Sequence, residues 1–194
     1  MGLTVLTSKN GDLWALQDAF LTKYTVDYQK IASFKVDSLS RKGNLPVWAM
    51  YEDTNGKIWY SDIGVKSFNP ETLKFEKVIS NEFPEIEKSI TYHFYEKEDG
   101  NILLCTTTGL YEMQLGKGII ARYWSGGEGK YHIPADDFRH LYFDKSTQSY
   151  WLATNETGLI HWNPKTNTSK TYTFNHHGTN TIHAVYTDEF GFLW

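Results

Sequence analysis

The feature that most constrains the fold of this chain is a short motif, a turn followed by a tryptophan, that recurs at nearly constant spacing. Successive copies are 45, 44, 48 and 43 residues apart. A period of about 40 to 50 residues, enough for roughly four short strands, is typical of a β-propeller. The last residue of the motif, G-x-x-W in its fullest form, is in turn Trp14, Trp59, Leu103, Trp151 and Trp194.

The strands of one repeat are clearest in residues 45–72. Apolar and polar residues alternate at the start of this stretch, and Asn55-Gly56 follows. Asn-Gly supplies the positive φ angles that a two-residue hairpin turn needs, so the sequence predicts a β-hairpin here. The four expected strands of this repeat are 47–51, 57–61, 65–68 and 74–78.

Two further markers recur in the same phase as the motif. A glycine followed by valine or leucine comes five to seven residues after the motif residue, and an Asn-Pro turn follows in two copies. Three markers in one phase support a repeat. The pairs are Gly64-Val65, Gly109-Leu110, Gly158-Leu159, Asn69-Pro70 and Asn163-Pro164.

The predicted fold class is all-β, with β-propeller blades that are each a four-stranded antiparallel sheet. Residues 1–194 are expected to form an incomplete ring of about four and a fraction blades, with almost no α-helix. An incomplete ring leaves blade faces exposed, so a homodimer or packing through these faces is expected. The blades are expected at 3–37, 44–78, 90–124 and 138–174, with a fifth starting at 182.

The first repeat is the most divergent, because Asp18-Ala19-Phe20-Leu21 replaces the glycine marker. Its strands are expected at 3–6, 12–16, 24–28 and 31–36. Residues 81–88 are expected to link two blades, and the glycine-rich residues 125–132 to form a flexible loop between blades.

Composition excludes several classes of function. The 19 Lys and Arg residues are scattered and are outnumbered by 23 Asp and Glu, so no nucleic-acid partner is expected. The single cysteine, Cys105, excludes an internal disulfide and is expected to be a buried, inert thiol. No apolar run is long enough to span a membrane, so no direct membrane contact is expected, and any anchor or export signal would lie outside these residues.

The repeats resemble the two-component regulator propeller repeat, whose pattern is roughly D-x-x-G-x-[LI]-W-[IL]-[GA]-T-x-x-G-L. The resemblance covers nearly the whole chain. It departs from the pattern at Leu103, at the missing turn glycine before Trp151, and in the first repeat. The matching residues are Asp53, Gly56, Trp59, Gly64, Asp99, Gly100, Thr106, Gly109, Leu110, Asp144, Trp151, Ala153, Thr154, Gly158, Leu159, Asp188, Gly191 and Trp194.

This resemblance implies the sensory ectodomain of a hybrid two-component sensor histidine kinase. Such propellers lie in the bacterial periplasm, detect glycan fragments and signal through a membrane helix to a kinase. Kinase, phosphoacceptor and receiver sequences do not occur in these residues. The resemblance therefore implies a fragment that senses an oligosaccharide, or serves as a scaffold, without catalysing a reaction.

The candidate ligand site comes from aligning the first strand of each repeat. In a propeller the first strand lines the central channel, so positions that change from blade to blade could contact a ligand. Aromatic rings stack on sugars, arginine binds a carboxylate or sulfate, and histidine donates or accepts. The alternative is that these side chains are simply solvated in the channel. The candidate ligand-binding residues are Trp48, Tyr92, Arg139, His183, His93 and His140.

Catalysis is not expected from the acidic residues. Asp136-Asp137 and the pair Glu85 and Glu87 are loop acids whose spacing does not suit an acid and base pair. The acids that recur before the motif are instead expected to form turns through hydrogen bonds to the backbone. These turn acids are Asp53, Asp99, Asp144 and Asp188.

No metal or cofactor is expected either. His176-His177, with His161 and His183 in the same region, lack the spacing of a zinc site and are expected to be solvated.

The 16% aromatic content fits rings that fill the gaps between blades, and also rings that line a carbohydrate or peptide pocket. A propeller-based carbohydrate-active enzyme, lyase or glycosidase, and a protein-interaction platform therefore remain alternatives to the sensor.

Overall fold

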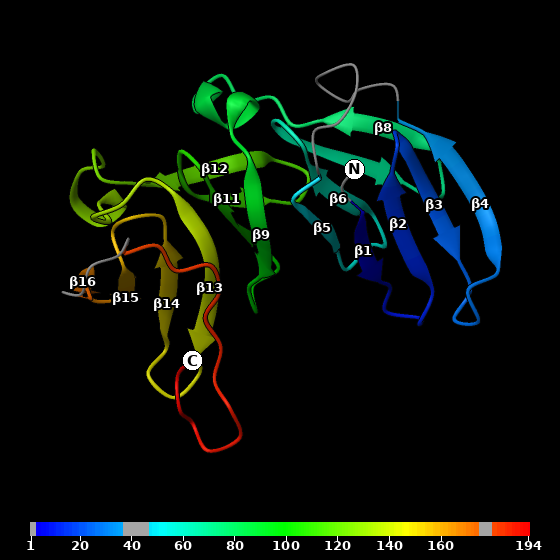
Figure 1. Cartoon of the computed structure of the whole chain (residues 1–194). Helices are drawn as coiled ribbons and strands as arrows, with labels where there is room; N and C mark the ends of the chain where they lie inside the picture. The colour runs from blue at the N-terminus through cyan, green and yellow to red at the C-terminus, as the bar shows by residue number, and fades with distance from the viewer. Residues whose placement is uncertain (1–2, 37–46, 175–179) are drawn as a thin grey trace. The chain divides into compact units, whose positions relative to one another are not determined.

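The structure is a computed structural model, and it describes residues 3–36, 47–174 and 180–194. These residues form four sheets of four strands, two short 3-10 helices and no α-helix (Figure 1). Within each sheet the strands lie side by side in chain order. The prediction of an all-β chain built from four-stranded antiparallel sheets is confirmed.

The strands have the following bounds. The first sheet contains β1 (Thr4–Thr7), β2 (Leu13–Gln17), β3 (Phe20–Tyr24) and β4 (Lys30–Lys35). The second contains β5 (Ala49–Glu52), β6 (Ile58–Ser61), β7 (Val65–Asn69) and β8 (Lys74–Lys77). The third contains β9 (Thr91–Glu96), β10 (Ile102–Thr106), β11 (Gly109–Gln114) and β12 (Gly118–Tyr123). The fourth contains β13 (Phe138–Asp144), β14 (Ser149–Thr154), β15 (Leu159–Asn163) and β16 (Thr168–Tyr172).

The chain divides into two compact units, residues 1–94 and 95–194, with the boundary inside β9. The first unit contains the first two sheets, and the second contains the fourth sheet and most of the third. That residues 1–194 form one partial propeller domain stays a prediction. The predicted end of the first blade at 37 and start of the second at 44 lie outside the described residues.

The predicted two-residue turn at Asn55-Gly56 is wrong, because the loop between β5 and β6 is longer. The amide of Asp53 donates to the carbonyl of Lys57 at 3.0 Å, and the amide of Gly56 donates to the carbonyl of Asp53 at 3.1 Å. Only Gly56 has a positive φ here, +76°. The loop takes this form because Oδ1 of Asp53 accepts the amides of Asn55 and Lys57, at 2.8 and 3.0 Å.

The same carboxylate also positions the recurrent tryptophan. Oδ2 of Asp53 accepts the indole N–H of Trp59 at 2.8 Å, and both residues are buried. In the C-terminal hairpin, residues 186–194, Oδ2 of Asp188 accepts the indole N–H of Trp194 at 2.9 Å. Asp99 and Asp144 each accept one or more turn amides in their sheets. The prediction that these acids form turns is confirmed, and the bond to tryptophan is an addition.

Two features explain why glycine recurs at the marker position: a positive φ angle, and the close approach of another backbone segment. Gly64 and Gly158 have φ values of +71° and +97°, which L side chains rarely adopt. A Cβ at Gly158 would lie 2.3 Å from the carbonyl oxygen of Tyr172. The first sheet does without the marker because Asp18 and Ala19 take positive φ values of 50° and 65° in the turn between β2 and β3.

One further strand prediction is wrong, whereas residues 81–88 and 125–132 connect successive sheets as predicted. Residues 24–28 are not a strand, because Thr25 and Gln29 close a turn and Tyr28 has a φ of 61°. The linker 81–88 contains a 3-10 helix, η1 (Pro84–Lys88). The loop 125–132 contains a second 3-10 helix, η2 (Gly129–Tyr131). Its first residue, Ser125, is held by Asp136, whose Oδ1 and Oδ2 accept the amide and the hydroxyl of Ser125 at 3.0 and 2.9 Å.

Each unit has an apolar core between two sheets. In the first unit Trp14 and Phe34 of the first sheet meet Phe68 of the second, with ring centroids 5.9 and 4.6 Å apart. In the second unit Cys105 of the third sheet is fully buried in a cluster with Leu152 and other residues of the fourth. Burial raises the pKa of the Cys105 thiol, which is therefore the inert, buried cysteine that the sequence predicts.

Replacing Asp53 by alanine is expected to destabilise the first unit by about 1 to 3 kcal/mol, because the buried indole N–H of Trp59 and two turn amides lose their acceptor. Denaturation by urea, followed by tryptophan fluorescence, measures this loss. Asp188→Ala is the matched control, because it removes the same bonds from a hairpin whose Trp194 is 66% exposed. It should cost much less, and equal losses for the two variants would contradict the role assigned to the buried bond.

Candidate functional site

The structure brings two of the candidate residues together in the first unit. Trp48 directly precedes β5, Tyr92 lies in β9, and their ring centroids are 5.5 Å apart in an edge-to-face arrangement. Trp48 is 47% exposed and Tyr92 is half-buried. This aromatic pair presents an open ring surface, held from one side, against which a flat or apolar ligand face can stack.

The backbone around the aromatic pair is held by Ser61, the last residue of β6. Its carbonyl accepts the amide of Trp48 at 3.0 Å, and its hydroxyl accepts the amide of Thr91 at 2.9 Å. The same hydroxyl donates to the carbonyl of Gly64 at 3.1 Å. The hydroxyls of Thr106 and Thr154 make the equivalent bond to a glycine carbonyl in their sheets, although counting from Trp59 puts Asp62, not Ser61, at the threonine of the repeat pattern.

His93 follows Tyr92 in β9 and is half-buried. The other three candidates, Arg139, His140 and His183, belong to the second unit. The six predicted residues therefore fall into two groups, one in each unit, and a ring contact joins Trp48 and Tyr92 in the first group.

Arg139 is the extra residue of a bulge in β13, between Phe138 and His140. Its guanidinium donates to Oδ2 of Asp137 at 3.2 Å, and the side-chain amide of Asn155 donates to the same oxygen at 3.2 Å. Burial raises the pKa of Asp137, although Arg139 opposes the shift. The positive charge predicted to bind an anionic ligand is thus already paired with a carboxylate of the chain.

His140 connects the fourth sheet to the C-terminal segment. Its Nδ1 accepts the amide of Val185 at 3.4 Å, and burial lowers the pKa of the imidazole. Two further bonds attach the same segment, from the amide of Ile182 to the carbonyl of Thr154 at 2.9 Å and from the hydroxyl of Thr187 to that of Tyr142 at 2.8 Å. His183, within this segment, is exposed.

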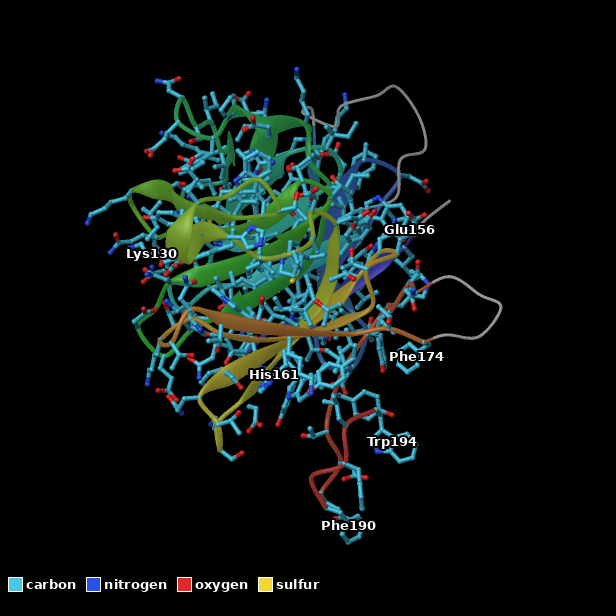
Figure 2. The ribbon with its side chains drawn as sticks, turned by 90° about the vertical axis from the view of Figure 1, so that its left-hand side faces the viewer. Lys130, Glu156, His161, Phe174, Phe190 and Trp194 are labelled. Carbon is cyan, nitrogen blue, oxygen red and sulfur yellow. The ribbon has the colours of Figure 1, made fainter. Side chains whose placement is uncertain are left out.

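The C-terminal hairpin carries an exposed group of aromatic side chains. Tyr186, Phe190, Phe192 and Trp194 are between 59% and 77% exposed. Figure 2 shows Phe190 and Trp194 at the end of the chain, away from the body of the fourth sheet. The hairpin has the same turn as the second sheet, yet its tryptophan is not buried as Trp59 is.

No group of three or more His, Cys, Asp or Glu residues in the described part of the chain could hold a metal ion. His176 and His177 lie outside the described residues. His161, labelled in Figure 2, has its Nε2 2.6 Å from the hydroxyl of Ser149, and its ring stacks on Trp151 at 4.3 Å. His161 therefore packs against other residues of the fourth sheet.

The acids considered for catalysis also have contacts within the chain. Asp136 accepts from Ser125, and Glu87 pairs with Lys77 at 2.9 Å.

Among the described residues, no helix is long and apolar enough to cross a bilayer.

No protein-family model and no curated protein matches the chain significantly. Solved structures do match. One, described as the extracellular domain of a hybrid two-component system from B. thetaiotaomicron, has a TM-score of 0.76 at 21% identity over 98% of this chain. Virginiamycin B lyase from Staphylococcus aureus has a TM-score of 0.71 at 12% identity over 100% of the chain. The WD40 β-propeller domain of Doa1 has a TM-score of 0.62 at 13% identity over 96%.

The chain has a β-propeller fold. The four sheets are its blades, as the repeat predicts, and the predicted resemblance to two-component propellers is confirmed at the level of the fold. The chain spans 25% of the length of the two-component structure, 62% of the lyase and 57% of the Doa1 domain. At these identities the comparisons establish the architecture, and function has to be argued from the residues.

Sequence reasoning missed the residues that hold the candidates in place. The sequence indicates Asp137 only as one of two adjacent loop acids, and it indicates no ligand-site role for Asn155. No sequence signal pairs Asp137 with Arg139 and Asn155, because the contact depends on the bulge in β13 and on the loop after β14.

Acidification is expected to loosen the C-terminal segment at His140. The pKa of His140 is lowered from its ordinary 6.5 in the folded chain, so the neutral ring is the form that supports folding. This contribution is complete above pH 6.5 and is lost as the pH falls through the lowered pKa, because protonated Nδ1 no longer accepts the Val185 amide.

Hydrogen exchange by NMR between pH 7.5 and 5, corrected for intrinsic rates, measures this effect at the Val185 amide. The Ile182 amide is the internal control, because its acceptor is the carbonyl of Thr154. Loss of protection at Val185 but not at Ile182 is the expected result. Parallel behaviour of the two amides, or no change in either, would contradict it.

Proposed function

We propose that this chain is a ligand-sensing propeller segment of the periplasmic part of a bacterial hybrid two-component sensor, and that it reads a glycan-derived oligosaccharide. The observation that carries the proposal is the aromatic pair Trp48 and Tyr92, with one ring 47% exposed. The fold shared with the extracellular domain from B. thetaiotaomicron supports the sensor class.

The chemistry of the aromatic pair supports a ring-shaped, hydroxylated ligand. Trp48 is 47% exposed, so its indole ring is accessible for stacking on the C–H face of a pyranose. The backbone under both rings is fixed through Ser61. Binding therefore loses little conformational entropy, which favours affinity.

The acids and histidines of the described residues support a role without catalysis. Asp137 is paired with Arg139, Asp136 with Ser125, and His161 with Ser149. These contacts within the chain account for the positions of the side chains in the fold. The chain accordingly acts as a binding segment, and a kinase elsewhere in the parent protein would generate the signal.

Calorimetric titration with a panel of acidic and neutral oligosaccharides tests the proposal. At least one oligosaccharide should bind, and Trp48→Ala should lower its affinity by about 10-fold, which corresponds to about 1.4 kcal/mol. Phe190→Ala is the matched control, because it removes another exposed ring, 77% exposed, outside the aromatic pair. The sensing role fails if no oligosaccharide of the panel binds, or if both variants lose affinity equally.

An enzyme is the second candidate, favoured by the fold shared with virginiamycin B lyase. Mass spectrometry of the same panel after incubation with the protein separates the two. Unchanged oligosaccharides agree with a sensor. A product whose formation stops when Asp136 or Asp137 is changed to asparagine would establish a carbohydrate-active enzyme instead.

A further inference from the structure

A buried ion pair lies in the second blade, in the segment that follows Ser61. Lys66, the second residue of β7, contacts Asp62 in the loop between β6 and β7, and their side chains are 2% and 1% exposed. Burial lowers the pKa of Lys66, and its bond to Asp62 opposes the shift.

A gain in folding stability does not by itself explain why the ion pair of Asp62 and Lys66 is so deeply buried. Removing two charges from water costs several kcal/mol for each ion, and their attraction often repays only that cost. A pair of apolar residues of similar volume would stabilise the blade as well or better. What the ion pair adds is a fixed geometry, because a buried charge is satisfied in very few arrangements of its loop.

The loop that the ion pair fixes is the one that holds the aromatic pair. Residues 61–64 make three backbone contacts with neighbouring strands or segments. The carbonyl of Ser61 accepts the amide of Trp48, and its hydroxyl accepts the amide of Thr91, next to Tyr92. The amide of Gly64 donates to the carbonyl of Ser89 at 2.7 Å.

The loop has no spare room in which to take another position. A Cβ on Gly64 would lie 2.9 Å from the carbonyl oxygen of Glu87, so the loop backbone is in close contact with the segment before β9. Asp62 directly follows Ser61 in the chain, and its side chain contacts that of Lys66, the second residue of strand β7. A shift of Asp62 therefore moves the acceptors of both ring-bearing strands.

We propose that Asp62 and Lys66 are positioning residues, whose buried ion pair sets the geometry of the aromatic pair Trp48 and Tyr92 through the loop 61–64. The inference deepens the proposed function, since it names what holds the ligand surface in register. It requires no ligand for its test.

The test replaces both charges by neutral groups of similar shape, in the double variant Asp62→Asn and Lys66→Met. The protein is labelled with 5-fluorotryptophan, and the Trp48 resonance is identified from the signal that Trp48→Phe removes. The expected result is a folded protein with a shifted or broadened Trp48 resonance, and amides of Gly64 and Thr91 that exchange at least 10-fold faster. A purely stabilising ion pair would change the unfolding midpoint and leave these signals alone.

The matched control is the exposed pair Lys57 and Glu76, 2.5 Å apart in the same blade. The variant Lys57→Met with Glu76→Gln removes the same two charge types and should leave the Trp48 resonance and both amides unchanged. A double variant at Asp62 and Lys66 that also keeps the wild-type signals would overturn the inference.

If that double variant does not fold, Asp62→Glu replaces it. Glutamate keeps the charge but is one methylene longer, so the loop has to shift to keep the ion pair. The Trp48 resonance should then move in a folded protein, and an unchanged resonance would overturn the inference. None of these measurements uses an oligosaccharide, so they stay decisive whether or not the calorimetric panel finds a ligand.

Discussion

The second blade depends on a carboxylate that is buried at the turn between its first two strands. Asp53 accepts two turn amides with one oxygen and the indole N–H of Trp59 with the other, while only 1% of it is exposed. A buried carboxylate without such donors would be costly. With them, a single side chain specifies the turn, the start of the next strand and the position of the largest ring in the blade.

The C-terminal hairpin separates the local part of this arrangement from the tertiary part. Asp188 makes the same bonds to its turn and to Trp194 as Asp53 makes in the second blade. Trp194 is nevertheless 66% exposed, whereas Trp59 is 7% exposed. The hydrogen bonds therefore need only a nine-residue hairpin, but burial of the ring needs the other strands of a sheet. Each blade combines a locally encoded turn with an interface that only packed sheets provide.

The sequence predicted what is encoded locally and repeatedly. The period identified four sheets, because turn acids, glycines and strand alternation recur in the same order. The two-residue turn at Asn55-Gly56 failed because the Asn-Gly preference was weighed without the carboxylate of Asp53. The strand at 24–28 failed because strand propensity does not reveal the positive φ of Tyr28. Alignment of repeats did place Trp48 beside Tyr92, since equivalent positions of adjacent blades are neighbours. The pairs Asp137 with Arg139 and Asp62 with Lys66 occur once each, so no period could indicate them.

Those unrepeated pairs show how one scaffold can carry different chemistry in each blade. One contact recurs: the side-chain hydroxyl of the last residue of the second strand donates to the carbonyl of a glycine in the same blade. The donors are Ser61, Thr106 and Thr154. The side chains beside these contacts differ, and each difference brings its own compensation. Lys66 is matched by Asp62, and Arg139 by Asp137. A charge can thus change in one blade if its partner changes with it, while the hydroxyl and glycine keep the strands in register. Side chains at the predicted ligand-binding positions can then differ between blades without altering the fold.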